Sequence, residues 1–99
     1  MNELDPVIHV QARLRIVTFL DILGPGDSLS FPRLQAMLGV TSGNLATHLR
    51  KLEESDYIKV QKVLEGRAPV TYIKLTEDGR LAFRIYKKNL RALLDESDD

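Results

Sequence analysis

Cysteine is absent from this chain of 99 residues. The chain therefore has no disulfide bond, no thiolate metal ligand and no cysteine nucleophile. This composition fits a reducing compartment, and we expect a cytoplasmic protein. Long apolar runs are also missing. No N-terminal segment resembles a signal peptide, and no segment approaches the roughly 20 apolar residues that span a bilayer, so we expect no membrane association.

Side chains suited to catalysis and metal binding are scarce as well. His9 and His48 are the only histidines in the sequence, and they are too few and too far apart for a zinc site. The serines have no histidine and aspartate at a spacing typical of a nucleophile, and no glycine run resembles a phosphate-binding loop. We therefore expect no enzymatic activity, no bound metal and no cofactor.

Net charge is missing too, because 14 basic and 14 acidic residues give a formal charge of zero. The distribution matters more than the sum: without the acidic tail, residues 1–94 carry 14 basic against 10 acidic side chains. We expect modest non-specific affinity for nucleic acid that depends strongly on salt. The length indicates one domain over residues 1–99, and the apolar fraction of 43% suits a folded chain. Residues 1–5 and 95–99 are predicted to be disordered tails.

The first helix is predicted to begin at Asp5, as N-cap, with Pro6 in its first turn, and to end near Leu23 at the Gly-Pro-Gly breaker of residues 24–26. It is apolar over most of its circumference. We expect it to bury one face against the domain core and a second face against another partner.

Two further helices joined by a tight turn are predicted between residues 30 and 54. Ser30 is the expected N-cap of the first, Gly39 ends it as a left-handed cap, and Thr41 is the expected N-cap of the second. This arrangement is typical of a helix-turn-helix. In the second helix the buried stripe, at positions i, i+4 and i+7, is Leu45, Leu49 and Leu52.

A β-hairpin follows, with strands predicted over residues 57–63 and 70–75 and a loop over residues 64–69. Val60 and Ile73 are expected to face inward. Together these elements predict a mainly α (α+β) fold, a winged helix-turn-helix. It is expected to combine the helices with a small antiparallel β-hairpin wing. A long terminal helix is expected to form the dimer.

The last helix is predicted to start at Thr76. It carries an apolar stripe of Leu81, Ala82, Ile85, Tyr86, Leu90, Leu93 and Leu94, and Phe83 is expected to lie off that stripe. The first and last helices have more apolar surface than one small core hides, which predicts a homodimer. The predicted dimer contacts are Ile8, Phe19, Phe83, Tyr86, Leu90 and Leu94.

The outward face of the second helix of the helix-turn-helix is small, polar and basic. Asn44 can pair with an adenine edge, Thr47 can touch a thymine methyl group, and Gly43 allows a close approach of DNA. Hydroxyls at the helix N-terminus and basic groups beside them can meet phosphates or base edges. These further predicted contacts are Thr41, Ser42, His48, Arg50 and Lys51. The alternative is an ordinary solvated helix face.

The hairpin supplies a second set of candidates. Arg67, beside Gly66 at the tip, is the best candidate for a minor groove, because narrow A·T-rich grooves attract arginine. Lys62 is a predicted phosphate contact. The alternatives are an ordinary charge on a hairpin and a lysine that protects a strand edge from aggregation.

Several motifs occur together in this chain: residues 13–17 (RLRIV), 43–53 (GNLATHLRKLE), the Gly66-Arg67 tip and residues 75–80 (LTEDGR). With them the chain resembles small single-domain winged-helix transcriptional regulators that stand close to the MarR and ArsR families. The resemblance implies a homodimer that binds operator DNA through its third helix and its wing. The Cys-x-Cys motif of ArsR-type metal sensors is absent, and the chain is shorter than MarR proteins with a ligand cleft. Neither metal sensing nor an effector pocket is therefore implied.

Two hypotheses follow. The first is a transcriptional regulator that binds double-stranded operator DNA sequence-specifically. The second is a winged-helix module for protein–protein assembly without sequence-specific DNA binding. The neutral charge favours the second, whereas Asn44, Thr47, Lys51 and Arg67 favour the first.

Overall fold

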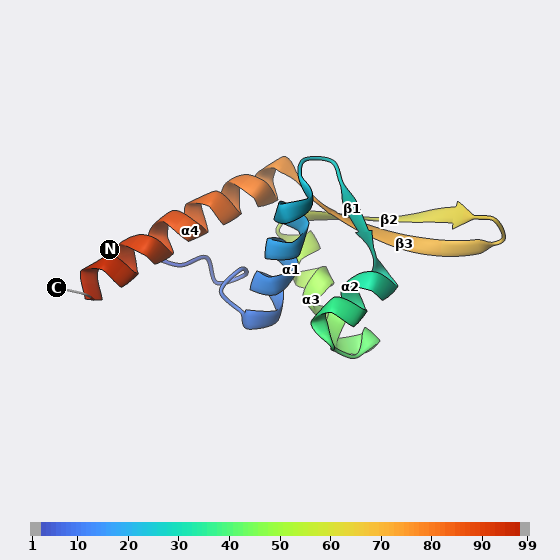
Figure 1. Cartoon of the computed structure of the whole chain (residues 1–99), viewed down its shortest axis with the longest axis horizontal. Helices are drawn as coiled ribbons and strands as arrows, with labels where there is room; N and C mark the ends of the chain where they lie inside the picture. The colour runs from blue at the N-terminus through green and yellow to red at the C-terminus, as the bar shows by residue number, and fades with distance from the viewer. Residues whose placement is uncertain (1–2, 98–99) are drawn as a thin grey trace.

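The computed structural model describes residues 3–97, which form four helices and a three-stranded antiparallel sheet (Figure 1). The three central helices make a compact body. The β-hairpin projects from one side of this body and the last helix from the other. The predicted winged helix-turn-helix architecture is confirmed. The elements in chain order are α1 (Gln11–Leu23), β1 (Ser28–Ser30), α2 (Phe31–Leu38), α3 (Ser42–Glu54), β2 (Ile58–Glu65), β3 (Ala68–Leu75) and α4 (Glu77–Ser97).

The predicted caps of the helix-turn-helix are confirmed. The Ser30 hydroxyl accepts a hydrogen bond of 3.3 Å from the Arg33 amide, and Thr41 accepts one of 3.1 Å from the Asn44 amide. Gly39 ends α2 with φ of 68°, in the left-handed region where a side chain would be strained. These local interactions help to fix the corner between α2 and α3.

The start of the first helix differs from the prediction. Asp5 accepts hydrogen bonds from the amides of Val7 (2.8 Å) and Ile8 (3.3 Å), but it caps only an isolated turn. Val10 then adopts extended angles, and α1 begins at Gln11. The turn stays separate because Ile8 is fully buried and the Arg13 Nε group donates to the Val7 carbonyl at 2.7 Å. The turn therefore packs under α1 and does not continue it.

The predicted tails are shorter than expected. Residues 3–5 are tied to the fold, since the Asn89 amide donates to the Glu3 carbonyl at 3.1 Å and Leu4 packs against the core. Residues 95–97 continue α4. The rest of the predicted tails, residues 1–2 and 98–99, lies outside the described residues.

The sheet has the strand order β1–β3–β2. Ile73 in the central strand pairs with Leu29 of β1 and Val60 of β2 and is fully buried, so its predicted inward orientation is confirmed. The loop predicted over residues 64–69 is wrong, because the strands pair as far as Glu65 and Ala68. Gly66, with φ of 64°, occupies the first position of a two-residue turn whose twist matches that of the strands.

The orientation of α4 also corrects the prediction. Phe83, expected off the apolar stripe, is 5% exposed and Tyr86 is 2% exposed, whereas Leu81 and Ile85 of that stripe are each 50% exposed. The rings of Phe83 and Tyr86 stack with centroids 6.4 Å apart, and the Tyr86 hydroxyl lies 2.8 Å from His9 Nδ1. The helix therefore turns its aromatic side to the body.

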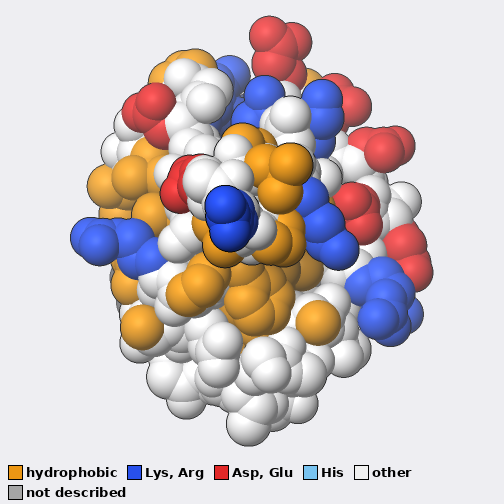
Figure 2. All heavy atoms as spheres, turned by 90° about the vertical axis from the view of Figure 1, so that its right-hand side faces the viewer, with side chains coloured by type: hydrophobic (Ala, Val, Ile, Leu, Met, Phe, Trp, Pro, Cys, Tyr) orange, Lys and Arg blue, Asp and Glu red, His pale blue; other side chains and the backbone are white. Residues whose placement is uncertain are grey.

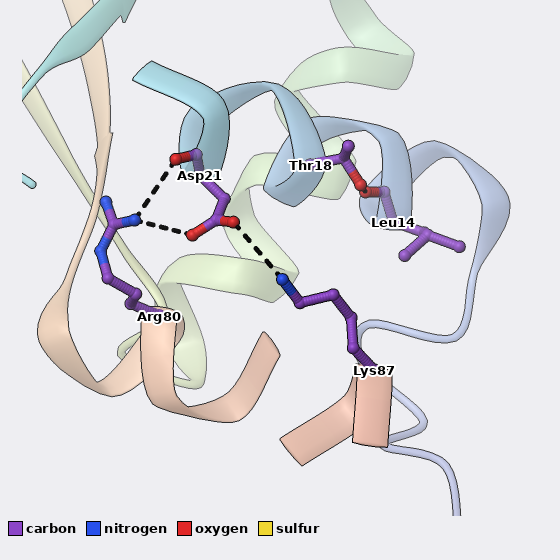
Figure 3. Close-up of polar contacts among 5 residues, drawn as sticks. All are labelled: Leu14, Thr18, Asp21, Arg80 and Lys87. Carbon is purple, nitrogen blue, oxygen red and sulfur yellow. Dashed lines mark hydrogen bonds and ion pairs between the residues drawn. The ribbon is translucent and has the colours of Figure 1, made fainter. Parts of the chain in front are cut away.

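Charged groups join α4 to α1 (Figure 3). Asp21 Oδ1 of α1 lies 2.7 Å from Arg80 Nη1, which also donates to the Asp21 carbonyl, and Asp21 Oδ2 lies 3.7 Å from Lys87 Nζ. Lys87 Nζ also lies 4.7 Å from the centre of the Phe83 ring. Of the helices in residues 3–97, none combines the length and apolar character needed to cross a membrane.

Candidate nucleic-acid interface

The third helix is amphipathic in the way its sequence predicts. Leu45, Leu49 and Leu52 are at most 4% exposed and lie in the core. The opposite face, which includes Gly43, Thr47 and Arg50, is exposed. In addition, Arg15 of α1 donates to the carbonyls of Met37 (3.4 Å) and Leu38 (3.3 Å) at the end of α2. The exposed face of α3 is therefore carried on a rigid corner.

The N-terminal turn of α3 is open to a ligand. Thr41, Ser42 and Gly43 are exposed, and a Cβ atom at Gly43 would have no heavy atom within 4 Å. The Thr47 hydroxyl donates to the Gly43 carbonyl at 3.0 Å, which holds the rotamer of this side chain. The Asn44 side chain is exposed and makes no hydrogen bond within residues 3–97. Its amide is thus available to a partner.

His48 is placed differently from its predicted neighbours. Its side chain lies on the flank of α3 and is half-buried. Its Nδ1 atom is buried and finds no hydrogen-bond partner in the part of the chain that the structure describes. That nitrogen is therefore closed to a partner in this structure, whereas Arg50 and Lys51 are both exposed.

The wing presents its cations outward. Lys62 and Arg67 are exposed, and Arg67 forms the two-residue turn together with Gly66. The acidic residue of the tip, Glu65, accepts a hydrogen bond from the Tyr72 hydroxyl. This bond raises the pKa of the Tyr72 hydroxyl above its ordinary value. The carboxylate is held along the strand instead of beside the guanidinium.

A shallow hollow of about 230 Å³ separates α3 from the wing. Arg50 and Ala46 line it from α3, and Val60 and Thr71 line it from the sheet. Phe31 completes the wall from the start of α2. Phe31 is not among the predicted site residues; its position next to Pro32, directly after the short strand β1, indicates that it lies beside the sheet.

Comparison with known proteins agrees with this geometry. Residues 12–94 match the family described as a winged helix DNA-binding domain. The chain belongs to this family. Its fold is that of winged-helix transcriptional regulators.

Individual relatives of this winged-helix protein support the assignment. An uncharacterized protein of Methanocaldococcus jannaschii is 41% identical over 71 residues, which cover 71% of this chain and 76% of the relative. A transcriptional regulator homologue from Pyrococcus horikoshii is 31% identical with a TM-score of 0.83, over 94% of this chain and 89% of that one. A protein assigned to the MarR family, from Enterococcus faecalis, has the same fold at 20% identity with a TM-score of 0.68, over 93% of this chain and 76% of that one.

Of the residues predicted to form a dimer interface, some lie in the core of the single chain and others are at least partly exposed. Ile8, Phe83 and Tyr86 are at most 5% exposed and lie in the core of the single chain, so they are not available to a second copy. They are buried because α4 turns its aromatic side to α1 and the N-terminal turn. Phe19 and Leu90 are half-buried, and Leu94 is 54% exposed near the end of α4.

Proposed function

We propose that this protein is a homodimeric transcriptional regulator that reads an operator in duplex DNA. In this proposal α3 lies in the major groove and the wing reaches the adjacent minor groove. The observation that carries it is the exposed polar and basic face of α3 beside a projecting hairpin with a cationic tip. Helices of this kind enter the major groove with their N-terminal residues against base edges.

Each residue then has a distinct role. Asn44 pairs with an adenine, because its free amide can both donate to and accept from the base edge. Thr47 turns its methyl group to a thymine, since its hydroxyl already donates to the Gly43 carbonyl. The phosphates flanking these bases are held by cations and by the start of the helix. The phosphate contacts are Thr41, Ser42, Arg50, Lys51 and Lys62.

The homodimer is supported by the shape of α4. A helix of 21 residues is about 31 Å long, and it projects well beyond α1 (Figure 1). Leu81, Ile85 and Leu93 on this helix are 43–50% exposed, and Ile22 at the end of α1 is 75% exposed. Burial of these side chains against a second copy would remove them from water and place two α3 helices on one duplex.

The DNA-reading role can be tested by selecting fragments from a random duplex pool with the wild-type protein. We expect Asn44→Ala to lose about 1–3 kcal/mol on the selected site and little on random DNA. Lys51→Ala is the matched control, which should weaken both DNAs together and reduce the salt slope by about one unit. Equal loss on both DNAs for Asn44→Ala would contradict base reading.

The dimer can be tested by sedimentation of the wild type and of the double variant Leu81→Glu and Ile85→Glu. Both side chains are half exposed, so the variant should fold. We expect the wild type to sediment as a dimer and the variant to dissociate, because four charges would then meet in one interface. A monomeric wild type at micromolar concentration would contradict the proposal.

The protein-assembly alternative keeps some support from the formal net charge of zero. Under this alternative the protein would bind no DNA sequence in preference to others. Failure of the wild-type protein to enrich any fragment at low salt, combined with a stable dimer, would favour this alternative over operator reading.

A further inference from the structure

The face of the wing that points away from the core carries a hydrogen bond that runs along the hairpin. Ile73 is fully buried, so its neighbour Tyr72 lies on the opposite face of the sheet. The Tyr72 hydroxyl donates to Oε1 of Glu65. These two residues are not cross-strand partners, because Tyr72 pairs with Gln61, whereas Glu65 pairs with Ala68 at the tip. The hydrogen bond therefore links the inner part of the hairpin to its tip.

This hydrogen bond spans a pair of valines. Val63 and Val70 pair with each other between the rows of Tyr72 and Glu65, on the same face of the hairpin. Val63 is 40% exposed and Val70 is half-buried. To meet each other, the phenol and the carboxylate must both lie along the hairpin over this pair. The Glu65 carboxylate is therefore turned back from the tip toward the body of the protein.

Glu65 stands out by its charge. It is the only acidic residue among residues 58–75, and that segment also contains Lys59, Lys62, Arg67 and Lys74. Arg67 follows it by two positions, within the turn. The ion pairs found among residues 3–97 both join Asp21 to α4, so the Arg67 guanidinium is paired with no carboxylate there. Figure 2 looks onto the wing tip and shows a basic side chain foremost, with hydrophobic side chains around and below it.

We propose that Tyr72 is a positioning residue for DNA binding, because its hydroxyl holds the Glu65 carboxylate away from Arg67. This inference rests on the proposed function, in which Arg67 enters a minor groove. A released carboxylate two residues from Arg67 would pair with its guanidinium and compete with the DNA for it. The hydrogen bond to Tyr72 leaves Arg67 available. Tyr72 thus determines how strongly the wing prefers narrow, A·T-rich grooves, although it does not touch the duplex.

The proposal makes the effect of the Tyr72 hydroxyl depend on the charge of residue 65. In Glu65→Gln the side-chain carbonyl oxygen can still accept a hydrogen bond from Tyr72, but no negative charge remains to compete for Arg67. Loss of the hydroxyl therefore matters only while residue 65 is a carboxylate. A hydrogen bond that served only to hold the shape of the hairpin would matter equally with glutamate and with glutamine.

The experiment is a double-mutant cycle of Tyr72→Phe and Glu65→Gln. Binding is measured on a fragment selected from random duplex DNA by the wild-type protein, with either A·T-rich or G·C-rich flanks. Tyr72→Phe keeps the ring and removes the donor. We expect it to weaken binding about threefold with A·T-rich flanks and less with G·C-rich flanks. Glu65→Gln should bind as the wild type does, and the addition of Tyr72→Phe to it should cause no further loss.

Unchanged binding by Tyr72→Phe, or an equal loss with glutamate and with glutamine at position 65, would overturn the inference and leave the proposed function standing. An equal loss on the two flank sets would do the same. Tighter binding by Glu65→Gln alone would show that the carboxylate opposes DNA even beside Tyr72, and would also overturn the inference. A wild type that binds no duplex would overturn both. Both side chains lie outside the core, so the four proteins should show matching thermal melts.

Discussion

The Tyr57 hydroxyl donates a hydrogen bond of 2.5 Å to Oδ2 of Asp5, across 52 residues of sequence. The other oxygen of Asp5 accepts the amides of the N-terminal turn. One carboxylate therefore caps that turn and ties it to the corner between α3 and β2. The hydrogen bond, with burial second, raises the pKa of Tyr57 to about 12.

The raised pKa predicts a stability effect with a defined pH window. Protonated Tyr57 is favoured by folding, so its contribution is fully present below pH 10 and is lost as the pH rises through about 12. We expect Tyr57→Phe to lower the free energy of unfolding at pH 7 by about 1 kcal/mol, a value reduced by solvent screening of this partly exposed pair. Urea unfolding between pH 7 and 11.5 should show the two proteins converging above pH 10; a constant difference would contradict the assignment.

Asp21 predicts a second, electrostatic effect on stability. Asp21→Asn keeps the size of the side chain but removes the charge that Arg80 and Lys87 share. We expect a loss of about 1–2 kcal/mol in the free energy of unfolding at low salt, which shrinks as salt screens the pairs in the wild type. Glu54→Gln, at an exposed position of α3, is the control and should change little. A loss that does not vary with salt would point to packing instead of charge.

Two helical glycines predict opposite results for the same substitution. A Cβ atom at Gly79 would lie 2.1 Å from the Tyr57 carbonyl oxygen, so Gly79→Ala must displace backbone and should destabilise by about 2–3 kcal/mol. Gly43→Ala meets no heavy atom within 4 Å and should be neutral or stabilise by about 0.5 kcal/mol. Thermal unfolding of both variants checks this. Equal stability would show that the chain between β3 and α4 is free to shift.

Arg67 predicts a sequence-dependent loss of DNA binding. The tip lies outside the core, so Arg67→Ala should melt as the wild type does. We expect it to weaken binding by roughly 1–2 kcal/mol on operators with A·T-rich flanks and less on G·C-rich flanks, because narrow minor grooves concentrate negative potential. Gel shifts on the two flank sets measure this. Equal losses would make Arg67 a phosphate contact, and no loss would show that the wing does not reach DNA.

Local sequence rules predicted the helix-turn-helix well. The caps at Ser30, Gly39 and Thr41 depend on residues within three or four positions, and the leucine stripe of α3 follows from helical spacing alone. The long extent of the hairpin was missed because six residues between two apolar runs look like a loop. The pairing of Leu64 with Pro69 shows that Leu64 belongs to a strand.

Which apolar side chains of the helices are buried in the core could not be predicted from the sequence. Phe83 and Leu81 are both apolar and both lie in α4, and the contact with α1 decides that the first is buried and the second exposed. The same contact buries Tyr86, and the packing of the N-terminal turn under α1 buries Ile8, so neither lies on the predicted dimer surface. Likewise, nothing near His48 in sequence shows that its Nδ1 atom is buried.

The two ends of strand β3 differ in how many neighbouring strands they pair with. Residues 72–74 are paired on both sides, with β1 and β2, whereas residues 68–71 pair with β2 alone. Bending stiffness therefore falls abruptly where β1 ends, and the outer ribbon can tilt about that line while the inner sheet stays fixed. Amide protons of the outer ribbon should exchange with solvent faster than those of the inner sheet. If the wing enters a minor groove as proposed, this tilt would let it follow grooves of different width without moving α3.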